Sequence, residues 1–166
     1  MRTGNCYLII CVVLQLLTSC GTPGSTAGNE DYTAISNLVN SREFEIEQEW
    51  AMPLSGSTIN LLGNPNYIRF KGDQVDIFLP YFGVRQSGGE YGGGDGGIKY
   101  VGPAEKIIIE ENTRRNNISI KFEGRQGTED LQFFITVMPG GNTQTSVSSS
   151  QRNAISYRGN LKPLKK

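Results

Sequence analysis

The chain has 166 residues, of which 16 are basic and 16 are acidic, so its formal net charge is zero. It contains no histidine, which excludes Ser-His-Asp and Cys-His nucleophile systems and ordinary catalytic zinc sites, because all of these need an imidazole. The balanced charge gives no electrostatic reason to expect nucleic acid as a partner.

The start of the chain predicts a lipoprotein signal. Arg2 supplies a positive end, and residues 6–17 form an apolar run that is shorter than the roughly 20 residues of a membrane-spanning helix. The sequence Leu17-Thr18-Ser19-Cys20-Gly21 resembles the bacterial lipobox, which implies lipid attachment at Cys20 and cleavage before it. We expect a signal peptide over residues 1–19 and a protein held on the membrane by lipid.

Cleavage before Cys20 has consequences for chemistry and for location. Cys6 and Cys11 leave with the signal, so disulfides, cysteine nucleophiles and thiolate metal sites are excluded from the mature domain. Gly21, and not an aspartate, follows Cys20, and the first acids, Glu30 and Asp31, come late. We therefore expect an outer-membrane lipoprotein on the periplasmic face, in preference to the cell surface.

The next residues predict a tether and a helix. Residues 20–30 are rich in Gly, Ser and Thr and hold no large apolar side chain, which indicates a flexible tether. A single domain is expected over residues 31–166. Its first feature is an apolar stripe at helical spacing, which predicts one short helix over residues 31–42. The stripe consists of Tyr32, Ile35, Leu38 and Val39.

From Phe44 the apolar period changes to two, which predicts a strand. Phe44, Ile46, Trp50 and Met52 are assigned to one face, with Gln48 between them. Glu43, Glu45, Glu47 and Glu49 are assigned to the other face. Aligned carboxylates suggest a calcium or acid/base site, but a solvated strand face paired with bases on a neighbouring strand is favoured, since hard cations gather ligands from loops.

Further strands follow at hairpin spacing. The clearest hairpin joins residues 67–71 and 75–79 through Gly72-Asp73, which suits a type II′ turn. Other strands are expected over residues 97–101, 106–111, 117–123 and 131–138, with weaker candidates at 143–148 and 154–158. The pattern predicts a mainly β fold, a single antiparallel β-sandwich or half-open barrel of about 8 to 10 short strands.

Two segments break this regularity. Residues 87–97 hold seven glycines, which predicts a loop that is either mobile or held in place by close approach of the backbone. Asp95 among these glycines suggests a calcium site, but the glycine-rich calcium-binding unit would have to recur, and here it occurs once. Residues 140–150 are polar and small, which suits an edge strand or a loop.

Three motifs resemble a known family. They are residues 79–83 (LPYFG), 92–100 (GGGDGGIKY) and 152–157 (RNAISY). Together they resemble the Bacteroidota lipoprotein family of the domain of unknown function 4251, over nearly the whole chain. The resemblance implies no assigned activity. Members often have a base directly after the first motif, whereas this chain has Val84 and then Arg85.

The motifs also suggest where a ligand would bind. Pro80 stops or bends its strand and presents Tyr81 and Phe82 near the glycine-rich loop. A candidate ligand or partner edge therefore comprises Tyr81, Phe82, Arg85, Tyr91, Asp95 and Tyr100. The favoured alternative is that Tyr81, Phe82 and Tyr157 are core or rim residues.

Two hypotheses for function remain. The preferred one is a non-catalytic, lipid-anchored envelope domain, without cofactor or metal, that binds an envelope protein or a glycan. The alternative is a carboxylate-dependent hydrolase acting on glycans, with Glu90 and Asp95 as the pair of acids in an obvious loop.

Overall fold

The computed structural model describes residues 26–86 and 96–165, with side chains from residue 31 onward. In chain order its elements are α2 (Thr26–Ser41), β1 (Glu43–Pro53), β2 (Ile59–Asn60), β3 (Tyr67–Lys71), β4 (Gln74–Leu79), β5 (Ile98–Pro103), β6 (Glu105–Asn112), β7 (Asn117–Gln126), β8 (Glu129–Val137), the 3-10 helix η1 (Pro139–Gly141), β9 (Asn142–Ser149) and β10 (Ile155–Pro163).

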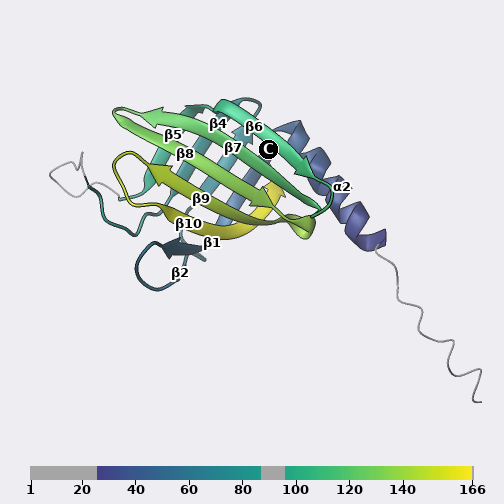
Figure 1. The fold of residues 1–166 in the computed structure, drawn as a ribbon, viewed down its shortest axis with the longest axis horizontal. Coiled ribbons are helices and arrows are strands. Elements are labelled where there is room, and N and C mark those ends of the chain that lie inside the picture. The colour runs from purple at the N-terminus through teal and green to yellow at the C-terminus, as the bar shows by residue number, and fades with distance from the viewer. Residues whose placement is uncertain (1–25, 87–95, 166) are drawn as a thin grey trace, which may run out of the picture.

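The strands form one antiparallel sheet that curls into a nearly closed barrel (Figure 1). Their order is β5-β4-β3-β1-β10-β9-β8-β7-β6, and β2 pairs separately with β1. The two ends of this path, β5 and β6, are consecutive in the chain, and the ring of Tyr100 on β5 lies against Gly124 on β7. The prediction of a mainly antiparallel β domain with one N-terminal helix is confirmed, in its barrel form.

Aromatic rings tie the two walls of the barrel together. Phe44 stacks on Phe70 with ring centroids 4.6 Å apart, and Phe70 meets Phe122 edge-on at 5.3 Å. Phe122 in turn stacks on Phe133 at 4.6 Å. Since β1 and β3 lie in one part of the sheet and β7 and β8 in another, this chain of contacts crosses the core, and each pair adds about 0.5–1.5 kcal/mol beyond burial.

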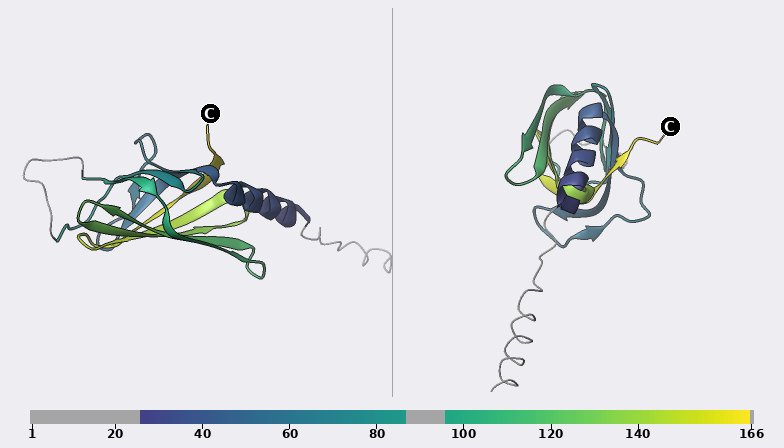
Figure 2. Two further views of the ribbon diagram at one scale, coloured as in Figure 1. Left: turned by 90° about the horizontal axis from the view of Figure 1, so that it is seen from above. Right: turned by 90° about the vertical axis from the view of Figure 1, so that its right-hand side faces the viewer.

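Helix α2 covers one end of the barrel, which we call the helix end (Figure 2). Val39 is fully buried, and Tyr32, Ile35 and Leu38 pack against the core, as the apolar stripe predicted. The helix begins at Thr26, within the segment predicted as a tether. Within residues 26–86 and 96–165, no helix is both long enough and apolar enough to cross a membrane.

Three polar side chains of α2 bind one carboxylate on β6. The Tyr32 hydroxyl donates to Glu111 Oε2 at 3.1 Å, while Ser36 Oγ and Asn40 Nδ2 donate to Glu111 Oε1 at 2.8 and 3.0 Å. These hydrogen bonds from Asn40, Ser36 and Tyr32 lower the pKa of Glu111 below its ordinary value of 4.5. The carboxylate therefore fastens the helix to the last strand of the sheet.

The glutamates of β1 lie on the outer face, where neighbouring strands pair with them. The contacts are Glu45–Arg69 at 2.5 Å, Glu47–Lys162 at 2.6 Å and Glu49–Asn160 at 2.7 Å. Across the described part of the chain, no group of three or more acids or other metal-ligating side chains gathers in a way that could hold an ion. Two of the four glutamates thus pair with bases on neighbouring strands, as the sequence favoured, while Glu49 accepts from an amide.

The assignment of Trp50 and Met52 to the inner face of β1 is wrong. A β-bulge between Gln48 and Trp50 shifts the register against β10, so that Ala51 enters the core and Trp50 is 38% exposed. The side chain of Asn66 holds the bulge, because its Oδ1 accepts from Gln48 N at 2.6 Å and its Nδ2 donates to Gln48 O at 2.9 Å.

The expectation of an edge strand or loop over residues 140–150 is also wrong. Strand β9 lies between β10 and β8, in the middle of the sheet. Its inward side chains, Thr143, Thr145 and Val147, are buried. They are β-branched and fit a pleated surface well, so a strand of low hydrophobicity takes a central place.

Candidate functional site

The first and third sequence motifs, with Gly96 and Gly97 from the described part of the second, meet at the end of the barrel opposite α2, which we call the loop end. Here the chain leaves β4 and returns to β5 (Figure 1). Gln86 N donates to Gln151 O at 2.7 Å, and Asn153 N donates to Val84 O at 3.1 Å. The segment after β4 is therefore bound along its backbone to the segment before β10.

The first motif is shaped by its tyrosine and its glycine. The Tyr81 hydroxyl lies 3.0 Å from Val84 O and 3.1 Å from Asn153 O, to which it donates. A Cβ on Gly83 would overlap that hydroxyl, so the turn needs glycine there. The Tyr157 hydroxyl donates to Pro80 O at 2.8 Å, and burial raises the pKa of Tyr157 well above its ordinary range. The first and third motifs are thus one packing unit.

A buried ion pair lies beside this unit. Arg152 Nε donates to Glu129 Oε1 at 2.8 Å and Arg152 Nη2 to Glu129 Oε2 at 3.0 Å, while Nη1 donates to Gly97 O at 3.0 Å. The two charged side chains are 6% and 5% exposed. The guanidinium also lies 5.3 Å from the centre of the Tyr81 ring. The pair therefore links β8, the start of β5 and the approach to β10.

Glu129 is held in its charged form. Burial alone would raise its pKa, but hydrogen bonds from Arg152 and Ser149 and the positive charges of Arg152 and Arg85 outweigh burial, so the pKa of Glu129 lies below 4.5. Arg85 Nη2 lies 3.6 Å from Glu129 Oε2. A general acid needs a raised pKa, so this environment does not suit Glu129 for proton donation. We interpret the pair as a structural clamp.

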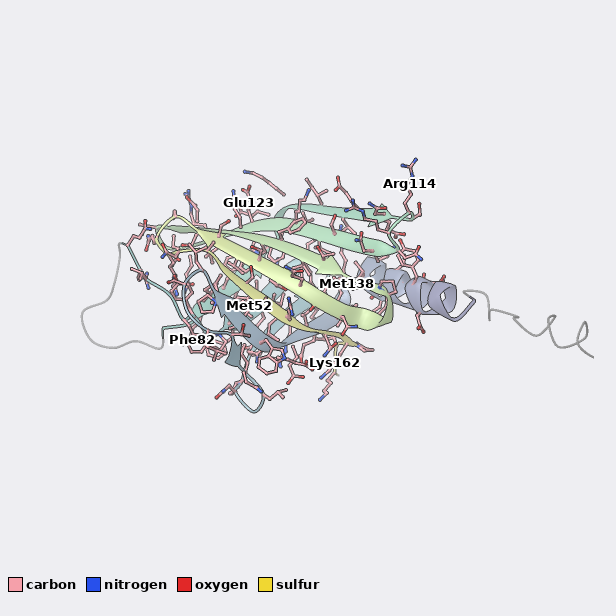
Figure 3. All side chains as sticks on the ribbon, turned by 60° about the horizontal axis from the view of Figure 1, so that its bottom comes forward. Met52, Phe82, Arg114, Glu123, Met138 and Lys162 are labelled. Atoms are coloured by element: carbon pink, nitrogen blue, oxygen red, sulfur yellow. The ribbon has the colours of Figure 1, made fainter. Side chains whose placement is uncertain are left out.

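The structure brings together some of the predicted edge residues. Tyr81 and Arg85 both lie at the ion pair, and Phe82 is 39% exposed at the loop end (Figure 3). Tyr100, by contrast, lies in the core and donates its hydroxyl to Pro103 O at 2.6 Å. The other two members of the edge, Tyr91 and Asp95, lie outside the described residues, as does Glu90 of the hydrolase hypothesis.

A second region is more open and contains none of the residues of the edge that the sequence predicts. The outer face of β6 to β9 carries a hollow of about 360 Å³, which we call the Phe134 groove. Its outward side chains are Lys106, Ile108, Lys121, Glu123, Gln132, Phe134, Ser146 and Ser148. Two further hollows, of about 530 and 260 Å³, share Gln132 with it, so the depression continues toward the β7–β8 turn. Glu123 projects from this outer face in Figure 3.

The register explains how the Phe134 groove is built. Ile108, Lys121, Phe134 and Ser146 are paired in turn across β6, β7, β8 and β9. Ile108 and Phe134 are 49% and 42% exposed, and the Lys121 ammonium lies 5.5 Å from the centre of the Phe134 ring. The Phe134 ring therefore lies between a base and a small hydroxyl, and Ile108 lies on the other side of the base.

Charges around the Phe134 groove are neutralised in pairs. The Lys106 ammonium lies 2.7 Å from Glu123, and the Lys121 ammonium lies 3.7 Å from Glu110. Side chains without charge, Gln132, Ser146 and Ser148, line the remainder of the groove beside the Phe134 ring. The groove thus offers one aromatic surface and several neutral hydrogen-bonding groups.

The sequence contained only part of the signal for these two regions. Arg152 opens a motif that was recognised, but its partner Glu129 lies 23 positions earlier in a turn-rich stretch, with no pattern that joins the two. Phe134 could have been found from the alternation of β8, since it falls on the polar side of that strand.

Comparisons with known proteins agree with this fold. The family described as a domain of unknown function (DUF4251) matches residues 27–161. A crystal structure of a DUF4251 family protein from Bacteroides eggerthii DSM 20697 is similar, with a TM-score of 0.62 and 20% identity over 80% of this chain and 87% of that chain. No curated protein matches the chain. Since the family match spans most of its length, the chain belongs to the DUF4251 family.

Proposed function

We propose that this protein is a lipid-anchored, non-catalytic domain of the cell envelope that binds a neutral glycan in the Phe134 groove. The anchor would be lipid on Cys20, after removal of residues 1–19, with the domain on the periplasmic side of the outer membrane. The lipobox-like sequence before Cys20 supports this part of the proposal.

The lining of the Phe134 groove is the observation that carries the binding part. Sugar rings offer apolar faces that pack on aromatic side chains and hydroxyls that pair with amides and small hydroxyls. Phe134, Gln132 and Ser148 supply these groups side by side. The neighbouring Lys106 and Lys121 are already paired with carboxylates, which favours an uncharged occupant over an acidic one.

Anchoring is tested by Cys20→Ala. Without the thiol no lipid can be attached, so the variant should leave the membrane fraction and appear in the soluble fraction, as detected by immunoblotting after fractionation and a salt wash. Ser19→Ala, which keeps a small residue before Cys20, is the matched control and should stay with the membrane. Retention of Cys20→Ala after the wash would contradict lipid anchoring.

Glycan binding is tested with Phe134→Ala. We expect neutral hexasaccharides, probed as cellohexaose, xylohexaose and chitohexaose, to shift the NMR signals of Gln132 and Phe134 in the purified protein. Loss of the ring should weaken binding about tenfold or more, because aromatic anchors carry a large share of binding energy. Leu62→Ala removes a side chain that is 63% exposed outside the groove and should leave affinity unchanged.

Two results would contradict the glycan proposal. One is the absence of any shift with the three neutral sugars. The other is a set of shifts confined to the loop end around Phe82, which would place binding on the edge that the sequence predicted.

A further inference from the structure

Two buried oxygens have no hydrogen-bond partner in the described residues. They are Oε1 of Gln48 on β1 and Oγ1 of Thr143 on β9. The two residues are 1% and 4% exposed, so bulk water does not reach them. A buried polar atom left without a partner costs about 1–3 kcal/mol, so each of these two oxygens needs an explanation.

The sheet register places both residues in the same row, on either side of β10. Gln48 is paired with Gly159 on β10, and Gly159 is paired with Thr143 on β9. Gly159 brings no side chain, and a Cβ built there would lie 2.8 Å from Gln48 Oε1, which places that oxygen directly over the glycine. The other end of the same amide is fixed, since Gln48 Nε2 donates to Thr145 Oγ1 at 3.2 Å.

This arrangement calls for a small occupant with both donors and acceptors. Gln48 Oε1 can only accept a hydrogen bond, whereas the Thr143 hydroxyl can donate or accept. The neighbouring Gly159 cannot supply a side-chain group. Turning the Gln48 amide over would exchange an unpaired acceptor for an unpaired donor. One polar atom of this side chain would still lack a hydrogen-bond partner.

We propose that the barrel wall contains a binding site for one water molecule, bridging Gln48 Oε1 and Thr143 Oγ1 above Gly159. The water donates one hydrogen to the amide oxygen and accepts from, or donates to, the threonine hydroxyl. Buried waters typically make 2–4 such bonds to groups that the protein leaves unpaired. Gln48 faces inward with Phe44 and Ile46 by the alternation of β1, ahead of the bulge, so its polar amide is buried and needs a partner.

The sign of one substitution discriminates between an occupied and an empty site. Thr143→Val replaces the hydroxyl by a methyl group of similar size. If water is bound, the substitution removes one of its partners, and the melting temperature should fall by about 2–6 °C. If the hydroxyl is truly unpaired, its removal relieves a penalty, and an unchanged or higher melting temperature would overturn the proposal.

A control and a crystal structure complete the test. Thr145→Val removes the known partner of Gln48 Nε2 and should lower the melting temperature in either case, which shows that the assay detects changes at this amide. A high-resolution crystal structure should show a water peak within about 3.2 Å of both oxygens. A direct Thr143–Gln48 hydrogen bond without that peak would overturn the proposal, even if Thr143→Val is destabilising.

Discussion

At the scale of single residues, the Glu129–Arg152 ion pair is the most demanding feature of the barrel. Both side chains are almost fully buried, so neutralising one leaves the other charge without compensation. We expect Glu129→Gln to lower the free energy of unfolding by about 3–5 kcal/mol, as measured by urea denaturation. Asp130→Asn is the control, because that exposed carboxylate pairs with Arg125 in solvent and should matter little.

The same carboxylate makes stability depend on pH. The folded pKa of Glu129 is lowered, so its contribution is fully present above the ordinary value of 4.5 and is lost as the pH falls through the lower, folded pKa. The urea concentration at the unfolding midpoint of the native protein should therefore decrease as the pH is lowered below 4.5. Glu129→Gln should flatten this dependence, and an equally steep acid transition in the variant would assign it to other carboxylates.

Side-chain positions that depend on neighbouring residues in the sequence could be predicted, whereas those that depend on distant residues could not. The glutamate row of β1 was assigned correctly, because a period of two is a local signal. Trp50 was misplaced, because the bulge depends on Asn66, which comes 18 positions after Gln48. No local sequence pattern indicates that the side chain of Asn66 makes hydrogen bonds to the backbone of Gln48 that a neighbouring strand would otherwise make.

At the scale of elements, Glu111 controls how α2 sits on the barrel. Its two oxygens accept from Tyr32, Ser36 and Asn40 on the helix. We expect Glu111→Ala to speed amide hydrogen exchange in α2 while the exchange of β7 and β8 stays slow, as measured by mass spectrometry. Glu110→Ala, one residue earlier, is the matched control, since Glu110 pairs with Lys121 instead.

Acid should act on α2 in the same direction. The pKa of Glu111 is lowered by its hydrogen bonds, so protonation as the pH falls below 4.5 weakens the attachment, and exchange in α2 should quicken there. If α2 exchanges at the same rate in Glu111→Ala as in the native protein, the apolar stripe alone holds the helix.

Strands with a clear alternation of apolar residues could be predicted, but the order in which the strands pair could not. The hairpin around Gly72 was found from its turn and its flanking strands, and Gly72 has the positive φ, 64°, that the turn requires. The central place of β9 does not follow from its own sequence, because its low hydrophobicity indicates an edge strand or a loop. Strand order depends on contacts such as Thr145 with Tyr157, which no single segment displays.

At the scale of the whole molecule, closure of the barrel depends on a close approach between β5 and β7. The Tyr100 ring occupies the space where a side chain of Gly124 would lie. We expect Gly124→Ala to lower the free energy of unfolding by about 1–3 kcal/mol in urea, because the ring must move in a packed core. Ser119→Ala, on the outer side of the same strand, should be nearly neutral, and equal effects would argue against a tight seam.

This seam also explains why the sequence left sandwich and barrel as alternatives. Alternation tells which side chains of β5 and β7 face inward, but both folds bury them. The choice depends on whether the ends of the sheet meet, and that depends on one tyrosine fitting over one glycine. Closure of the sheet into a barrel thus depends on residues far apart in the chain and cannot be inferred from any single strand.

If lipid on Cys20 anchors the chain as proposed, the start of α2 limits how far the barrel can stand from a bilayer. Thr26 comes six residues after Cys20, a stretch that reaches about 20 Å at most. The 16-residue helix is about 24 Å long, but it packs on the barrel from Tyr32 onward, so only its first residues project (Figure 1). On a lipid-anchored chain, the short linker and the docked helix would together hold the barrel near the bilayer, with the helix end toward the lipid and the loop end directed away from it.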